Sequence, residues 1–359
     1  MRAWHVGSVI LAVVILATGL IAHGGGTQTP AGQKPQVVSP LGKQFFAKAD
    51  SDGAIAKADA ALAADPNNLD LLIAAARARD TALQFDASIA MYTKAIGLAP
   101  NDVRAYRFRG HRYISTRKFD LAIKDLERAL ALAPSSFDVA YHLGLAYFMT
   151  AQFPAAATTY RACLERKTPG PALPAGWRDC AALSGGAAPA GGAAPAASGG
   201  AAAAGGGAAA ARGGAPVAGG GAATSAAQAP DDDSRMGVSD WLYRSYRRAG
   251  RAEEAMVLLS GIRDGLTVKE NEAYYRALLF YRGVRTEAQV LPAEAFKENT
   301  GVSVGYGLAN YYLAEGQTVK ACALMRRLVQ DDAHWNAFGY IGAETELTRA
   351  NGPCVAQAK

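Results

Sequence analysis

Small and aromatic side chains recur at a fixed interval through the first half of the chain. The small positions are Ala61, Ala95, Ala129 and Cys163, and the aromatic ones are Phe85, Phe119 and Phe153. Prolines at 66, 100 and 134 are each followed two residues later by a residue that suits a helix N-terminus, namely Asn68, Asp102 and Ser136. Apolar positions three, four and seven apart share one helix face. A period of about 34 residues therefore predicts stacked pairs of helices.

The third and fourth units carry this pattern most completely. Their marker residues are Tyr106, Gly110, Tyr113, Phe119, Ala122, Ala129 and Pro134, then Leu143, Gly144, Tyr147, Phe153, Ala156, Tyr160 and Cys163. These residues resemble the tetratricopeptide repeat, a pair of antiparallel helices. The resemblance implies about four repeats over residues 39–167. The first repeat is expected to begin with a shortened helix at Ser39, because Pro40 suits the first helical position.

Residues 168–234 interrupt the repeats. Between Ala181 and Pro230 the chain is almost entirely Ala, Gly, Pro and Ser, with Arg212 as its one charge. Such a segment buries too little apolar surface to offset its chain entropy, so we expect a disordered linker.

A second set of markers then returns at a nearly equal interval, at Gly250, Gly283 and Gly316, and predicts a second array over residues 235–359. Pro292 should end a helix in its middle repeat, and residues 334–350 should form a closing helix. The predicted fold class is therefore all-α: a helical-hairpin solenoid, similar to tetratricopeptide repeats, in two arrays separated by the disordered Ala/Gly/Pro-rich linker.

The N-terminal residues predict export. Between Arg2 and Lys34 no charged residue occurs, and Val6 to Ala22 is a nearly unbroken apolar run followed by His23 and three glycines. We interpret residues 1–24 as a signal peptide or an N-terminal membrane anchor, with residues 25–38 as a short linker. Both alternatives place the body outside the cytoplasm, in the periplasm or an equivalent compartment. In the second, residues 6–22 anchor it in the inner membrane.

The four cysteines, Cys163, Cys180, Cys322 and Cys354, form an even set, which in an exported chain is compatible with two disulfides. Pairing of sequence neighbours would fasten the last helix pair of each array to the segment that follows it. Other connectivities remain open, and the alternative is a set of buried core thiols.

Charge and composition exclude little else. The net charge is +6, but 37 basic and 31 acidic residues alternate along the predicted helices, so nucleic-acid binding is not supported. The five histidines have no ligand spacing with one another or with cysteine, so no metal site is predicted. We find no cofactor motif either.

One short motif is compatible with catalysis. Gly301, Ser303 and Gly305 match the spacing around the nucleophile of serine hydrolases, and Asp331 and His334 lie downstream. That motif requires a strand before the serine, and none is predicted. We therefore interpret Ser303 as a helix cap and the protein as not an enzyme, with a serine hydrolase as the alternative.

The repeat frame also predicts a binding surface. It places Lys43, Arg77, Arg104, Arg107, His111 and Tyr141 on the inner, concave wall of the first array. Arginine and lysine side chains bind carboxylates, so the wall is a candidate site for a protein or peptide partner, with an acidic partner as one option. The alternative is a solvated face whose charges pair with Asp70, Asp80 and Asp138. At the level of function, the sequence predicts a scaffold for protein–protein interaction, with a passive spacer in an envelope complex as the other possibility.

Overall fold

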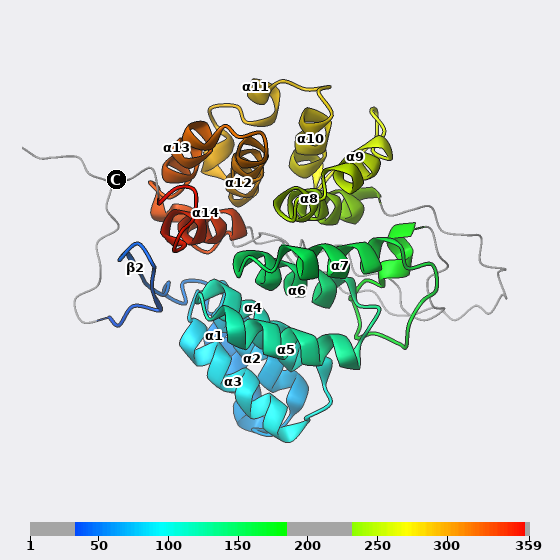
Figure 1. The fold of residues 1–359 in the computed structure, drawn as a ribbon. Helices are drawn as coiled ribbons and strands as arrows, with labels where there is room; N and C mark the ends of the chain where they lie inside the picture. The colour runs from blue at the N-terminus through cyan, green and yellow to red at the C-terminus, as the bar shows by residue number, and fades with distance from the viewer. Residues whose placement is uncertain (1–32, 185–231, 356–359) are drawn as a thin grey trace, which may run out of the picture. The chain divides into compact units, whose positions relative to one another are not determined.

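The computed structural model describes residues 33–184 and 232–355 (Figure 1). The expected signal or anchor and most of the expected linker lie outside these residues. The described chain is built from helices that pair antiparallel along the sequence, as the repeat period predicts. The all-α fold class and the helical-hairpin solenoid are confirmed.

The first array contains seven α-helices among the described residues. They are α1 (Ala54–Ala64), α2 (Leu69–Thr81), α3 (Phe85–Leu98), α4 (Val103–Ser115), α5 (Phe119–Leu132), α6 (Phe137–Met149) and α7 (Phe153–Leu164). Asn68, Asp102 and Ser136 accept hydrogen bonds from backbone N–H groups in the first turns of α2, α4 and α6, as expected of capping residues.

The turn inside each hairpin repeats with the sequence. Leu83, Arg117 and Ala151 all have positive φ, between 55° and 61°, and occupy equivalent positions in successive repeats. Side chains other than glycine are uncommon in this left-handed region. In the second array the equivalent turns use Gly250 and Gly283, which adopt it at little cost.

The predicted opening helix at Ser39 is wrong. Residues 37–45 form a small antiparallel hairpin, in which β1 (Val37–Val38) pairs with β2 (Gln44–Phe45). Ser39 receives a hydrogen bond from the backbone N–H of Leu41, and Gly42 has a φ of 77°. Proline followed two residues later by glycine in the left-handed region favours a tight turn over a helix start.

The second array begins at α8 (Asp232–Arg248), three residues before the expected boundary. It continues with α9 (Ala252–Ser260), α10 (Glu272–Tyr281), α11 (Glu287–Val290), α12 (Asn299–Ala314), α13 (Thr318–Leu328) and α14 (Phe338–Thr348). Short 3₁₀ helices lie at η1 (Cys180–Ser184), η2 (Ala295–Lys297) and η3 (Asp332–His334). As predicted, α11 is short and ends before Pro292.

The two arrays pack directly against each other. Helix α8 lies on α7 much as α6 lies on α5, so the stacking of hairpins continues across the linker (Figure 1). Phe148 of α6 contacts Trp241 of α8 with their ring centroids 5.3 Å apart. One hydrophobic cluster includes residues of both arrays.

Two disulfides join sequence neighbours. Cys163 of α7 is bonded to Cys180 of η1, and Cys322 of α13 is bonded to Cys354 beyond α14. Each ties the last helices of an array to the segment that follows. Within the described residues, no helix is both long and apolar enough to cross a membrane.

Candidate binding surface on the inner wall

The inner wall of the first array is formed by α2, α4 and α6, and part of it remains accessible near the N-terminal end. Arg77 of α2 is exposed, and its guanidinium lies 5.3 Å from the ring centroid of Phe108 on α4. Phe108 is half-buried and stacks on Tyr92. A cation above an aromatic ring is a favourable arrangement even at an exposed site.

A tryptophan outside the repeat frame completes this end of the wall. Trp177, on the segment between α7 and η1, meets Phe108 edge to face with centroids 6.2 Å apart. The buried guanidinium of Arg107 lies 4.9 Å from the Phe108 ring and 5.9 Å from the Trp177 ring. We call Arg77, Phe108 and Trp177 the open patch. The repeat period could not reveal Trp177, because the residue follows the last repeat and the Cys163–Cys180 bond holds its segment in place.

The predicted arginines differ in their availability. Arg104 donates to the carboxylates of Asp102 (2.7 Å) and Asp70 (2.6 Å), and these hydrogen bonds, that with Asp102 foremost, raise its pKa. Arg107 is buried and donates to Asp138 at 3.0 Å, while burial lowers its pKa. Both therefore already have carboxylate partners, so Arg77 is the arginine of the predicted set that remains exposed.

His111 and Tyr141 do not line an open surface. The His111 ring lies 4.4 Å from that of His142 on α6 and 5.3 Å from that of Phe338 on α14. Tyr141 is buried, and its ring also lies near Phe338, at 6.4 Å. The last helix of the chain thus covers this part of the wall.

His142 is buried and His111 is half-buried, and removal from water has an electrostatic consequence for both. Desolvation lowers the pKa of both imidazoles well below 6.5, and the charges of Arg112 and Arg107 add to the effect. Nδ1 of His142 lies 2.6 Å from the backbone oxygen of Asp138, while its Nε2 is buried without a hydrogen-bond partner. Both rings are therefore neutral near pH 7.

Lys43 was expected on the inner face of a first helix, and this placement is wrong. It lies at the turn of the β1–β2 hairpin, where its ammonium donates to the backbone oxygen of Val329 and to the carboxylate of Asp332, both at 2.6 Å. Sequence periodicity could not find these partners, which lie 286 and 289 residues away.

Further contacts surround Lys43 and α14. Trp335 stacks on Phe45 of β2, with ring centroids 4.8 Å apart, and meets Phe85 edge to face. Arg117, between α4 and α5, donates to Glu344 at 2.6 Å and to the backbone oxygen of Trp335 at 2.8 Å. We call the contacts of residues 329–349 with the first array the C-terminal contact.

The second array has no comparable open wall among the described residues, because α12 packs back against α8. Asp240 and Arg244 of α8 form an ion pair that is fully removed from solvent, and the Arg244 guanidinium lies 4.3 Å from the Trp241 ring centroid. Burial raises the pKa of Asp240 to about 6. These polar groups belong to the interior of the array.

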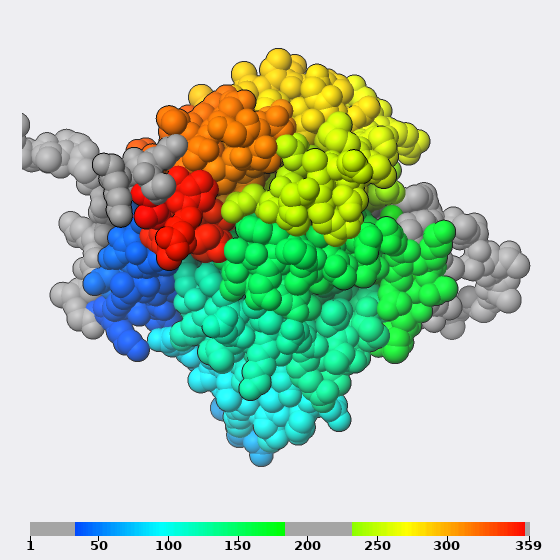
Figure 2. Space-filling model, in the orientation of Figure 1, coloured from blue at the N-terminus to red at the C-terminus, as the bar shows by residue number. Residues whose placement is uncertain are grey.

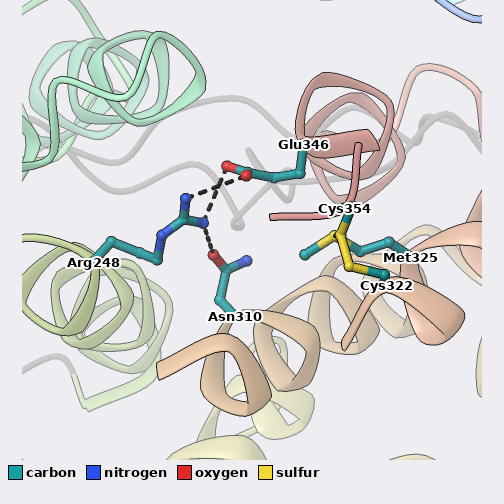
Figure 3. The surroundings of a disulfide bond; sticks show 6 residues. All are labelled: Arg248, Asn310, Cys322, Met325, Glu346 and Cys354. Carbon is teal, nitrogen blue, oxygen red and sulfur yellow. Dashed lines mark hydrogen bonds and ion pairs between the residues drawn. A yellow bond between two sulfur atoms is a disulfide. The ribbon is translucent and has the colours of Figure 1, made fainter. Parts of the chain in front are cut away.

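A second buried carboxylate lies close to the disulfide of this array. Arg248 donates to both oxygens of Glu346, at 3.0 and 3.2 Å, and to Asn310 at 2.7 Å (Figure 3). The Sγ atom of Cys354 lies 4.0 Å from Sδ of Met325. Arg248 of α8 therefore connects Glu346 of α14 with Asn310 of α12, whereas Glu344 binds α14 to the first array.

The hydrolase alternative finds no support in the placement of Ser303. The residue lies inside α12 with 2% of its surface exposed, and its hydroxyl interacts with that of Tyr274. It is therefore not the helix cap that the sequence suggested either. Nδ1 of His334 contacts Oδ1 of Asn299 at 2.6 Å, and Asp331 caps η3. Across the described ranges, no group of three or more His, Cys, Asp or Glu is placed to hold a metal ion.

The structure is an all-α solenoid of stacked helical hairpins. Residues 103–136 match the family model of the tetratricopeptide repeat, so the resemblance is confirmed and this segment, α4 and α5, is such a repeat. No curated protein matches the chain.

Solved structures of tetratricopeptide repeat proteins align with this chain. YrrB, a TPR protein with an unusual peptide-binding site, is 12% identical over 79% of this chain and 97% of that chain, with a TM-score of 0.39. A tetratricopeptide repeat protein from Parabacteroides merdae is 13% identical over 82% of this chain and 91% of its own, with a TM-score of 0.41. The fold assignment rests on the helix pairs themselves.

Proposed function

We propose that the protein is an exported scaffold that binds a protein or peptide partner at the open patch. The observation that carries this proposal is the exposed Arg77 guanidinium over Phe108, whose ring meets Trp177 edge to face. Two half-buried aromatic rings provide apolar contact area, and an exposed guanidinium provides a charged anchor. Patches of this composition are typical of binding sites on proteins.

The charge of the patch favours a partner with a carboxylate. Arg104 and Arg107 have their own aspartates, so the charge left for a ligand is that of Arg77. A peptide with an acidic side chain beside an apolar or aromatic one fits this arrangement. Its carboxylate would bind the guanidinium, and its apolar side chain would pack against the exposed parts of the two rings.

Two features support location outside the cytoplasm. The apolar run at residues 6–22 is typical of an export signal or anchor, and two disulfides are typical of oxidising compartments. We therefore propose a periplasmic or other extracytoplasmic location, with anchoring in the inner membrane if residues 6–22 are retained. Mass spectrometry of the mature N-terminus separates cleavage from retention.

The binding site is tested by crosslinking and affinity capture from the native envelope. The chain with Arg77→Glu and Trp177→Ala should lose a partner that the wild type captures, at least tenfold by quantitative mass spectrometry. Arg263→Glu is the control, because it makes the same charge change at an exposed residue of the second array. Equal capture by all three chains would refute the proposed site. A wild type with no reproducible partner would favour the passive spacer.

A further inference from the structure

The C-terminal contact buries charged groups between the two arrays. Glu344 is fully buried on α14, and Arg117 holds one of its oxygens with two hydrogen bonds, of 2.9 and 2.6 Å. Burial raises the pKa of Glu344, against the opposing effect of Arg117. A side-chain hydrogen bond with Ser39, at the turn of the β1–β2 hairpin, also helps to lower this pKa.

The Arg117–Glu344 ion pair contributes little net free energy to the stability of the contact. Taking two charges out of water costs about as much as their attraction returns, and apolar side chains of equal volume often stabilise an interface as well. What a buried ion pair does provide is selection, because a partner without the matching carboxylate leaves Arg117 buried and unpaired.

A second part of the array boundary lies at α8. There α6 and α7 meet α8 through aromatic side chains: Phe148 packs on Trp241, and Phe153 lies under the guanidinium of Arg248, 4.4 Å from its ring centroid. The C-terminal contact also has aromatic packing, of Trp335 on Phe45 and of Phe338 on His111, and it adds the Arg117–Glu344 and Lys43–Asp332 ion pairs. Charged groups in the C-terminal contact would keep the two exposed surfaces soluble when α14 separates from the first array, whereas purely apolar surfaces would aggregate.

Residues of α14 and the turn before it therefore bind the first array as a ligand would. Trp335 packs on Phe45, Phe338 packs on His111, and Glu344 binds Arg117. Figure 2 shows this C-terminal segment against the hairpin and helices of the first array. The motif that this surface accepts therefore has two aromatic anchors, Trp335 and Phe338, and a glutamate, Glu344, six residues after the second anchor.

We propose that the face of the first array around Phe45, His111 and Arg117 is a receptor for an acidic helix with an aromatic anchor, and that α14 of the same chain is its resident occupant. A partner that carries such a helix takes the place of α14 as the C-terminal contact separates. This inference rests on the proposed scaffold function and specifies a partner for a second part of the same inner wall.

The test uses the full-length oxidised chain and a fluorescein-labelled synthetic peptide of residues 331–349. In the chain with Phe338→Ala and Glu344→Gln, α14 loses its anchor and its charge, so the peptide should bind at least tenfold more tightly than to the wild type. Adding Arg117→Glu to that chain should remove the gain. A peptide with the same two substitutions at Phe338 and Glu344 is the matched control.

A second measurement avoids dependence on the folding of the variant. In the wild-type chain, a large excess of the peptide should speed amide hydrogen exchange at residues 338–348 and leave exchange in α5 unchanged. Absence of binding to a folded double variant, or binding that Arg117→Glu does not weaken, overturns the inference. If the double variant does not fold, unchanged exchange in the wild type overturns it.

These results are separable from those for the open patch. Arg77 and Trp177 pack against side chains of α4 and are not part of the C-terminal contact, so Arg77→Glu with Trp177→Ala should leave peptide binding unchanged. Loss of peptide binding with capture intact refutes only the receptor for α14. Loss of the open-patch effect with peptide binding intact refutes only the proposed site at Arg77.

Discussion

Acidification should weaken the C-terminal contact, because His111 and His142 must stay neutral within it. Both imidazoles have a pKa well below the ordinary 6.5, owing to burial and then to nearby arginines. The groups that face the pair are Arg107 and Arg112 of α4 and the backbone oxygen of Asp138, with the apolar Phe338 on the side of α14. Because the pKa of these histidines is lower in the folded state than in the unfolded state, their contribution to stability is fully present above about pH 6.5. This contribution is lost as the pH falls further.

The size of the effect follows from proton linkage. A histidine that takes up a proton only when unfolded loses about 1.4 kcal/mol of stabilising free energy between pH 7.5 and pH 5.5. Two such residues give a loss of about 3 kcal/mol, which is an upper limit. Asp240 acts in the opposite direction, because its pKa of about 6 lets the folded chain bind a proton that the unfolded chain does not. The histidine contribution must therefore be read as a difference between variants.

Urea unfolding at pH 7.5 and pH 5.5 measures that difference. A chain with His111→Gln and His142→Asn should lose less stability on acidification than the wild type, by about 2 to 3 kcal/mol. In His142→Asn, the asparagine side chain keeps an N–H group that can donate to the backbone oxygen of Asp138. His334→Gln, on η3, is the control and should behave as the wild type. An equal pH dependence in the wild type and the double variant would refute the reasoning.

Two further predictions test the packing and the hydrolase alternative. Gly144→Ala should lower the free energy of unfolding by roughly 1–3 kcal/mol, because the added Cβ would overlap the Tyr160 ring. The control is Gly97→Ala, at a position in open space on α3, which should raise the free energy of unfolding by up to about 1 kcal/mol. Denaturant titration of both variants measures the two changes. A fluorophosphonate probe should leave Ser303 unlabelled by mass spectrometry, because the residue is buried beside Tyr274; stoichiometric labelling would revive the hydrolase.

Local signals in the sequence predicted the repeats because each repeat is stabilised largely by near neighbours. Asn68 and Asp102 cap helices that begin at the next residue, and Gly110 lies where the Leu126 side chain of the paired helix leaves no room for a Cβ. These contacts span one hairpin, so they recur with its period. Ala61 is exposed although its equivalents are buried, because α1 has no full helical partner before it in the described chain.

The candidate surface differs in part from the sequence prediction. Arg77 is exposed on α2, whereas His111 and Tyr141 were expected in the open and have their rings against Phe338 of α14. Trp177 was missed altogether. These outcomes depend on contacts with segments that follow the array, about which the repeat period contains no information.

The sequence by itself determined the helical hairpins, their caps and their turns, because these depend on side chains that lie within one repeat period of one another. Only the tertiary structure decided which part of the inner wall stays accessible. Arg117 and Glu344 are 227 residues apart, and they meet because the second array curls until α12 packs on α8 and α14 reaches the first array. That curvature is the sum of small rotations between successive hairpins, and no single repeat specifies it.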